Sequence, residues 1–92
     1  MSEQDKISLY NSALSRYGIN AQQMMLVEEC GELLNAIAKL HRGRVGINEV
    51  ITELADVSIM VEQMALFFGL DDFKAEKERK LQRLSERLKK SQ

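Results

Sequence analysis

The chain has 92 residues, of which 45% are hydrophobic and 29% are charged, and its formal net charge is −1 at pH 7. These values indicate one globular domain over residues 1–92, exclude a disordered or fibrous chain, and give no reason to expect nucleic acid as a partner. Cys30 is the only cysteine, and the acidic N-terminal residues do not resemble a signal peptide, so we expect a cytoplasmic protein.

The first two predicted helices follow from apolar spacing and from the position of glycine. Apolar residues recur at helical intervals over residues 3–17, and Gly18 is suited to end that helix. Asn20 is predicted to cap a second helix that continues to residue 41 or 42, because its side chain can accept from amides of the first turn. Proline is absent from the chain, which also favours an all-α fold.

A short glycine-containing segment, residues 43–47, reads as a loop between two antiparallel helices. Asn48 is predicted to cap a third helix that stops at Gly69, and a fourth, highly charged helix is predicted over about 71–90. The expected architecture is a four-helix-type bundle. Its antiparallel core is formed by the second and third helices, within about residues 20–70.

The third predicted helix is apolar on almost every side. Val50, Leu54 and Val61 share one face, while Ile51 and Ile59 lie on others. Such a wide apolar surface predicts a second subunit packed against it; the alternative is a helix at the centre of a monomeric bundle. The same stretch is interrupted by acidic residues, so we do not expect it to span a membrane.

Two pairs of acidic residues stand inside these apolar patterns. Glu29 and Glu32 are three residues apart on the second helix, and Glu53 and Asp56 repeat that spacing on the third. Residues three apart lie about 60° apart around a helix, so four carboxylates can converge between antiparallel neighbours. Oxygen ligands of this kind are preferred by Mg²⁺ and Mn²⁺.

An isolated acidic pair on a solvated helix face is common, but these acids have no basic residue within a turn. No lysine or arginine occurs between Arg16 and Lys39, or between Arg44 and Lys74. Like charges at helical spacing repel, and apolar surroundings add a desolvation cost. A bound divalent cation would remove both penalties.

These residues resemble the signature of the MazG-like all-α nucleoside triphosphate pyrophosphohydrolases. The similarity rests on Glu28-Glu29-Cys30-Gly31-Glu32 and Glu53-Leu54-Ala55-Asp56, with twenty residues between the two motifs, and covers about residues 20–70. It implies a helical dimer, or a dimer of dimers, that cleaves a (d)NTP to the monophosphate and pyrophosphate with Mg²⁺. Glu29, Glu32, Glu53 and Asp56 would then bind the metal.

Further residues are candidates for the same chemistry. Glu28 is a candidate catalytic residue that orients a ligand or a water, or else a solvated side chain. The candidate phosphate-binding residues are basic; they lie near the end of the second helix and on the fourth, and each could instead be an ordinary surface side chain: Lys39, Arg42, Arg79, Lys80 and Arg83.

The leading expectation is therefore a cytoplasmic hydrolase that serves nucleotide-pool control or house-cleaning, with a nucleotide as ligand and another copy of the chain as partner. The alternative is a non-catalytic helical oligomer that acts as a protein-interaction module. Nucleic-acid binding through the C-terminal helix is disfavoured, since acidic residues interleave its basic ones.

Overall fold

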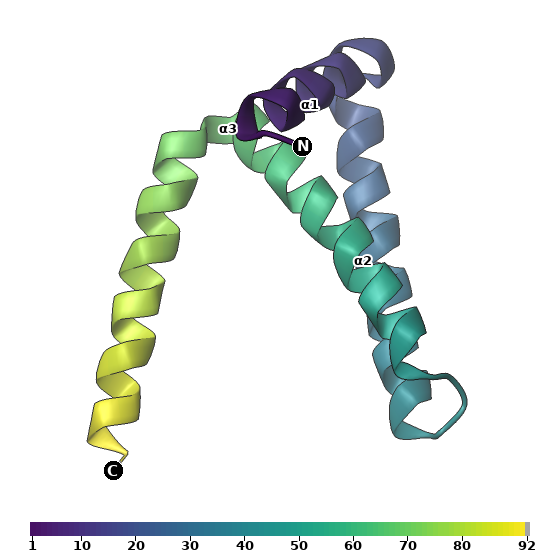
Figure 1. The fold of residues 1–92 in the computed structure, drawn as a ribbon, viewed down its shortest axis with the longest axis vertical. Helices are drawn as coiled ribbons and strands as arrows, with labels where there is room; N and C mark the ends of the chain where they lie inside the picture. Colours follow the sequence, from purple (N-terminus) through teal and green to yellow (C-terminus); the bar gives the residue numbers. More distant parts are fainter. Residues whose placement is uncertain (92) are drawn as a thin grey trace.

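The computed structural model describes residues 1–91, which form three α-helices: α1 (Glu3–Tyr17), α2 (Ile19–His41) and α3 (Ile47–Lys90). The predicted all-α class is confirmed. Figure 1 shows α2 and the first part of α3 running antiparallel side by side, with α1 across one end of the pair. The last part of α3 bends away from that pair, so the end of α3 lies far from the α2–α3 loop.

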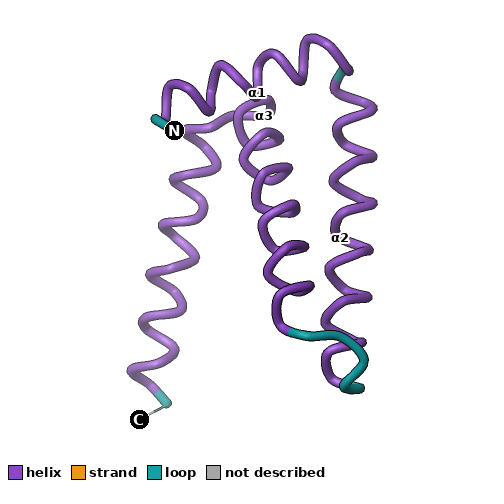
Figure 2. Tube along the Cα trace, turned by 45° about the vertical axis from the view of Figure 1, so that its right-hand side comes forward, coloured by secondary structure: helices purple, strands orange, loops and turns teal. Residues whose placement is uncertain are grey.

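The bend in α3 lies at Gly69, whose backbone angles (φ 145°, ψ 94°) are not helical. An L-residue with a side chain rarely adopts such a positive φ, whereas glycine does so at little cost. The predicted break at Gly69 is thus present, but the helix resumes at once. Residues 70–90 are named the arm below; in one chain the arm stands apart from the α2–α3 pair (Figure 2) and does not close a four-helix bundle with it.

Two predicted helix caps are wrong. α2 begins at Ile19, because Gly18 (φ 87°) turns the chain directly from α1 into α2 and its carbonyl already accepts from the Gln22 amide at 3.1 Å. Similarly, α3 begins at Ile47 after Gly46, before Asn48 can act as a cap. By contrast, the start of α1 has a side-chain cap, in which Ser2 and Asp5 exchange hydrogen bonds of 3.0 and 3.2 Å.

The core of the single chain is thin. Its buried apolar residues are few and come from all three helices: Tyr10 of α1, Ala36 of α2, and Met60, Met64 and Ala65 of α3. Within residues 1–91, none of the helices combines the length and the apolar character needed to span a membrane.

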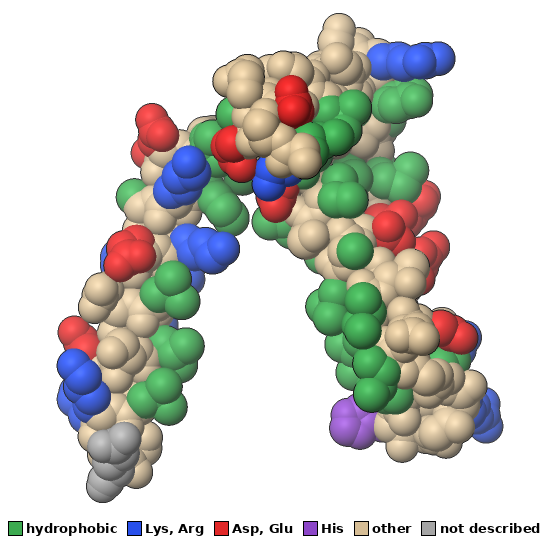
Figure 3. All heavy atoms as spheres, in the orientation of Figure 1, with side chains coloured by type: hydrophobic (Ala, Val, Ile, Leu, Met, Phe, Trp, Pro, Cys, Tyr) green, Lys and Arg blue, Asp and Glu red, His purple; other side chains and the backbone are tan. Residues whose placement is uncertain are grey.

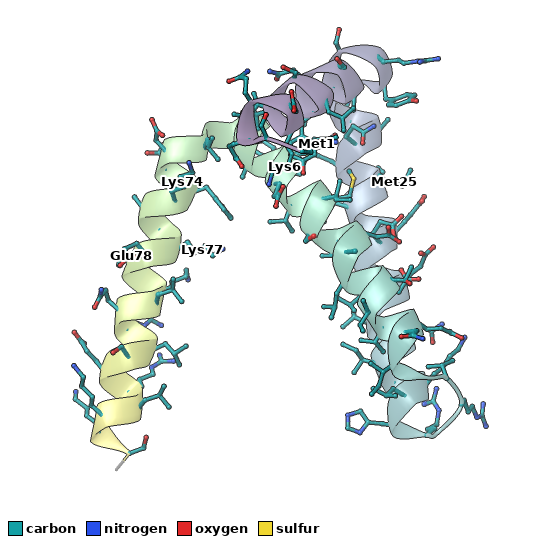
Figure 4. All side chains as sticks on the ribbon, in the orientation of Figure 1. Met1, Lys6, Met25, Lys74, Lys77 and Glu78 are labelled. Atoms are coloured by element: carbon teal, nitrogen blue, oxygen red, sulfur yellow. The ribbon has the colours of Figure 1, made fainter. Side chains whose placement is uncertain are left out.

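A polar contact fastens α1 to α3. The Tyr10 hydroxyl donates a hydrogen bond to Glu62, and the Lys6 ammonium, labelled in Figure 4, lies 4.0 Å from the same carboxylate. Burial, together with the Glu62 carboxylate, raises the pKa of Tyr10 to about 12. Helical spacing does not predict this contact, because 52 residues separate the two partners.

We expect Tyr10→Phe to destabilise the fold by about 1–2 kcal/mol, since it removes a part-buried hydrogen bond to a charged group. The raised pKa adds a pH dependence: Tyr10 contributes fully below its unfolded pKa of 10.0, and this contribution is lost as the pH rises towards 12. Urea unfolding monitored by circular dichroism measures the change. Tyr17→Phe is the control, because Tyr17 is exposed; equal midpoints for the two variants would contradict the prediction.

Candidate metal centre

Three of the predicted metal ligands come together between α2 and α3. Glu29 of α2 and Glu53 and Asp56 of α3 each place one carboxylate oxygen so that all three oxygens lie within 4.8 Å of one another. The antiparallel pairing of α2 with the first part of α3 (Figure 1) allows acidic residues of the two helices to meet in this way. This trio is named the acidic cluster.

Glu32, the fourth predicted ligand, lies beside the acidic cluster rather than among its three convergent oxygens. It sits nearly one turn beyond Glu29, and its side chain is exposed. Its carboxylate is nevertheless close enough to help raise the pKa of both Glu29 and Glu53. A small side-chain rearrangement would therefore add it to the ligand set.

The geometry of α2 explains why Glu29 points at α3. Gln22, Glu29 and Ala36 are spaced seven residues apart, so each lies about 20° from the next around the helix. Gln22 and Ala36 are both buried, so this line of α2 faces α3. The small Ala36 side chain leaves room for α2 and α3 to approach each other. The carboxylate of Glu29 lies between the two helices.

The acidic cluster has no internal compensation for its charge. Oε2 of Glu29 and Oε2 of Glu53 are buried and accept no hydrogen bond. The ion pairs found within residues 1–91 involve none of the clustered acids. Two buried carboxylate oxygens without a donor are costly, and a cation is the simplest compensation.

The pKa values follow from this arrangement. Burial first, and then the carboxylates of Glu32, Asp56 and Glu53, raises the pKa of Glu29 above its ordinary value. The pKa of Glu53 is raised in the same way, by burial and then by Glu32 and Asp56. An all-oxygen donor set with mutual repulsion fits a hard divalent cation such as Mg²⁺ or Mn²⁺.

The other predicted site residues are not brought to the acidic cluster. Glu28 is exposed, pointing about 100° away from Glu29 around α2. Lys39 is partly buried near the end of α2, and the backbone of Arg42 ends that helix by donating to the carbonyls of Ala38 and Lys39.

Basic candidates on the arm lie close to an acidic side chain of the same helix instead. The Arg79 guanidinium pairs with Glu76, and the Lys80 ammonium lies 4.0 Å from the same carboxylate. Arg83 is exposed on the same helix. In one chain, therefore, Arg79, Lys80 and Arg83 belong to a segment that bends away from the acidic cluster.

Two buried amides between the helices were not predicted from the sequence. Gln22 and Gln63 are 8% and 3% exposed, and Oε1 of Gln63 accepts no hydrogen bond. Gln22 precedes Glu29 by seven residues and Gln63 follows Asp56 by seven, so both lie in line with the cluster, about 10 Å away along the helices. The seven-residue spacing from Glu29 and from Asp56 is the feature of the sequence that could have identified both glutamines.

Comparisons of the chain with protein-family models, with curated proteins and with solved structures found no match. A function for the chain therefore has to be inferred from the acidic cluster and its surroundings.

Proposed function

We propose that the chain is a Mg²⁺-dependent nucleoside triphosphate pyrophosphohydrolase, which converts a (d)NTP to the (d)NMP and pyrophosphate. The observation that carries this proposal is the acidic cluster, with its two buried, unpartnered carboxylate oxygens. The resemblance of both acidic motifs to the MazG-like family supplies the reaction. A role in nucleotide-pool control or house-cleaning belongs to the same proposal.

Each acidic residue has a proposed role. Glu29, Glu53 and Asp56 would hold the cation, with Glu32 completing the ligand set after a side-chain movement. When bound, the cation neutralises phosphate oxygens and aligns water for attack at phosphorus. Glu28 precedes Glu29 in the chain and points about 100° away from it around α2; its proposed role is to orient a ligand or a water molecule.

The basic residues divide into two sets. Lys39 and Arg42 lie on the same chain as the acidic cluster, near the end of α2, and are the first candidates to bind the outer phosphates. Arg79, Lys80 and Arg83 can serve a cluster only if the arm of one copy reaches another copy. We accordingly include a homodimer or homotetramer in the proposal.

A second candidate function is a non-catalytic helical oligomer that acts as a protein-interaction module. Large apolar side chains that are exposed along both α2 and α3, such as Leu34 and Ile51, favour it. This function needs neither metal nor nucleotide. It therefore makes opposite predictions for a nucleotide assay.

A direct assay separates the two candidates. The purified protein is incubated with a panel of NTPs and dNTPs in Mg²⁺, and both pyrophosphate and monophosphate are measured, with EDTA as the control. We expect equimolar pyrophosphate and monophosphate from at least one nucleotide, and no product with EDTA. Absence of product across the panel, together with a melting temperature that does not respond to Mg²⁺ or Mn²⁺, would favour the non-catalytic oligomer.

A further inference from the structure

A pocket of about 230 Å³ lies where α1 meets the bend of α3, and is named the bend pocket below. Its walls come from α1, from α3 just before Gly69 and from the start of the arm. The lining residues recur at intervals of three or four and so share one face of each helix. Those that matter most are Lys6, Ile7 and Tyr10 on α1, and Phe73, Lys74 and Lys77 on the arm.

The interior of the bend pocket is mostly apolar. Ile7, Leu66 and Phe73 line it and are only half-buried, so part of their apolar surface is not covered within the chain. An apolar protein cavity of about 150 Å³ is large enough to hold benzene, so a single ring fits here. Pockets for drug-sized ligands begin at roughly 300 Å³, so the bend pocket suits a one-ring ligand rather than a nucleotide.

Both acidic side chains that line the bend pocket already have partners. These are Glu3 and Glu62. The Lys6 ammonium lies 3.3 Å from the Glu3 carboxylate and 4.0 Å from that of Glu62, and the Tyr10 hydroxyl donates a hydrogen bond to Glu62. Their negative charge is therefore compensated from α1.

The uncompensated charges of the bend pocket are the ammonium groups of Lys74 and Lys77. Within residues 1–91, the ion pairs involve neither of these lysines. Figure 4 shows Lys6 on α1 and the other two lysines on the nearby end of the arm, and Figure 3 shows basic side chains beside the bend. Three lysines against two glutamates leave the pocket with one positive charge, which a monoanion would balance.

We propose that the bend pocket binds a small aryl carboxylate, with its ring against Ile7, Leu66 and Phe73 and its carboxylate between Lys74 and Lys77. Ammonium groups form charge-assisted hydrogen bonds with a carboxylate, and these are stronger than bonds to a neutral acceptor. The ligand would contact the helix on both sides of Gly69. The bend pocket shares no residue with the acidic cluster or with the other proposed site residues, so this proposal does not depend on the proposed activity.

A titration of the full chain with phenylacetate tests the proposal. Amide chemical shifts of the ¹⁵N-labelled protein report binding, and those of residues 3–10 and 65–77 should change most. We expect a dissociation constant of about 1 mM, which is typical of a ligand with about ten non-hydrogen atoms. Phenylacetamide has nearly the same shape but no charge and should bind about tenfold more weakly. Acetate, which has the charge but no ring, should cause no saturable shift at the same concentrations.

A charge-matched pair of double variants tests the role of the lysines. Lys74→Gln combined with Lys77→Gln should weaken phenylacetate binding about tenfold, because it removes both unpaired ammonium groups. Phenylacetamide binding should stay unchanged in this variant. Lys89→Gln combined with Lys90→Gln is the control, since it removes the same charge from the same helix outside the bend pocket. All four positions are exposed, so both variants should keep the helical circular dichroism of the wild type.

Three results would overturn the proposal. The first is the absence of a saturable shift with phenylacetate up to about 20 mM. The second is equal affinity for phenylacetate and phenylacetamide, which would show that the pocket does not select an anion. The third is an equal loss of affinity in the two double variants, which would indicate attraction by the overall charge of the arm. None of these measurements requires a metal ion, a nucleotide or catalysis.

Discussion

Replacing Glu53 by glutamine will make the metal-free protein more stable and remove most of its response to Mg²⁺. Oε2 of Glu53 is buried without a hydrogen-bond partner, and burial together with the neighbouring carboxylates raises the pKa of Glu53. Glutamine has nearly the same shape but no charge, so it relieves the repulsion from Glu32 and Asp56. The same change removes a ligand from the proposed cation site.

Activity should respond in the opposite direction to stability. Loss of a residue that only supports a metal ligand typically costs 10- to 100-fold, so loss of a ligand should reduce turnover by about 100-fold or more. Thermal unfolding with and without Mg²⁺, and pyrophosphate release, measure the two effects. Glu76→Gln is the control, because Arg79 holds the pKa of Glu76 below its usual range; that variant should gain no stability.

The pH dependence of the metal-free protein follows from the same groups. Folding raises the pKa values of Glu29 and Glu53, so the folded state binds protons more readily than the unfolded state does. Stability should therefore increase as the pH falls from neutral towards these raised pKa values, and decrease as the pH rises through them. Glu53→Gln should flatten this profile. Profiles of the same slope for wild type and variant would contradict the assignment.

The sequence was sufficient for the class of fold and for the convergence of three of the four predicted acids, because both depend on helical periodicity. Helical spacing places Glu53 and Asp56 on one face, and the short loop before α3 forces it to run antiparallel to α2. The absence of basic residues near these acids in the sequence further indicated that their charges are not neutralised by ion pairs. It agrees with the lack of ion pairs from Glu29 and Glu53 in the structure.

Other features depend on long-range packing, which spacing does not specify. The bond between Tyr10 and Glu62 joins residues far apart in the chain, and the direction of the arm depends on the backbone angles of one glycine. The cap predictions failed because Gly18 and Gly46 let the helical hydrogen bonds begin before Asn20 and Asn48. At Gly18 the positive φ of 87° favours glycine, whereas Gly46 has an extended backbone (φ −91°, ψ 171°) that any residue can adopt.

Gly69→Ala is expected to change the shape of the whole molecule. Gly69 adopts φ 145° and ψ 94°, a conformation that costs an L-residue about 1–3 kcal/mol. The added Cβ would meet only Asp72, at 3.4 Å from Oδ2, so the strain is in the backbone. Alanine is the best helix former, and the chain can avoid the strain by continuing α3 straight. A straight helix of 44 residues would be about 66 Å long.

X-ray scattering and light scattering measure this change together. The wild-type chain has a Cα radius of gyration of 16.1 Å and a longest extent of 46 Å, and both dimensions of the chain should increase in the variant. A straight α3 would also redirect the arm, so a homodimer in which the arm of one copy reaches another copy should be lost as well.

Gly43→Ala is the control, since Gly43 also has a positive φ of 68° but lies in the α2–α3 loop. It should lower stability by about 1 kcal/mol without changing shape or mass. A Gly69→Ala variant that kept the wild-type scattering profile and mass would show that the bend does not depend on glycine, and that the arm is held in place by contacts other than the backbone of residue 69.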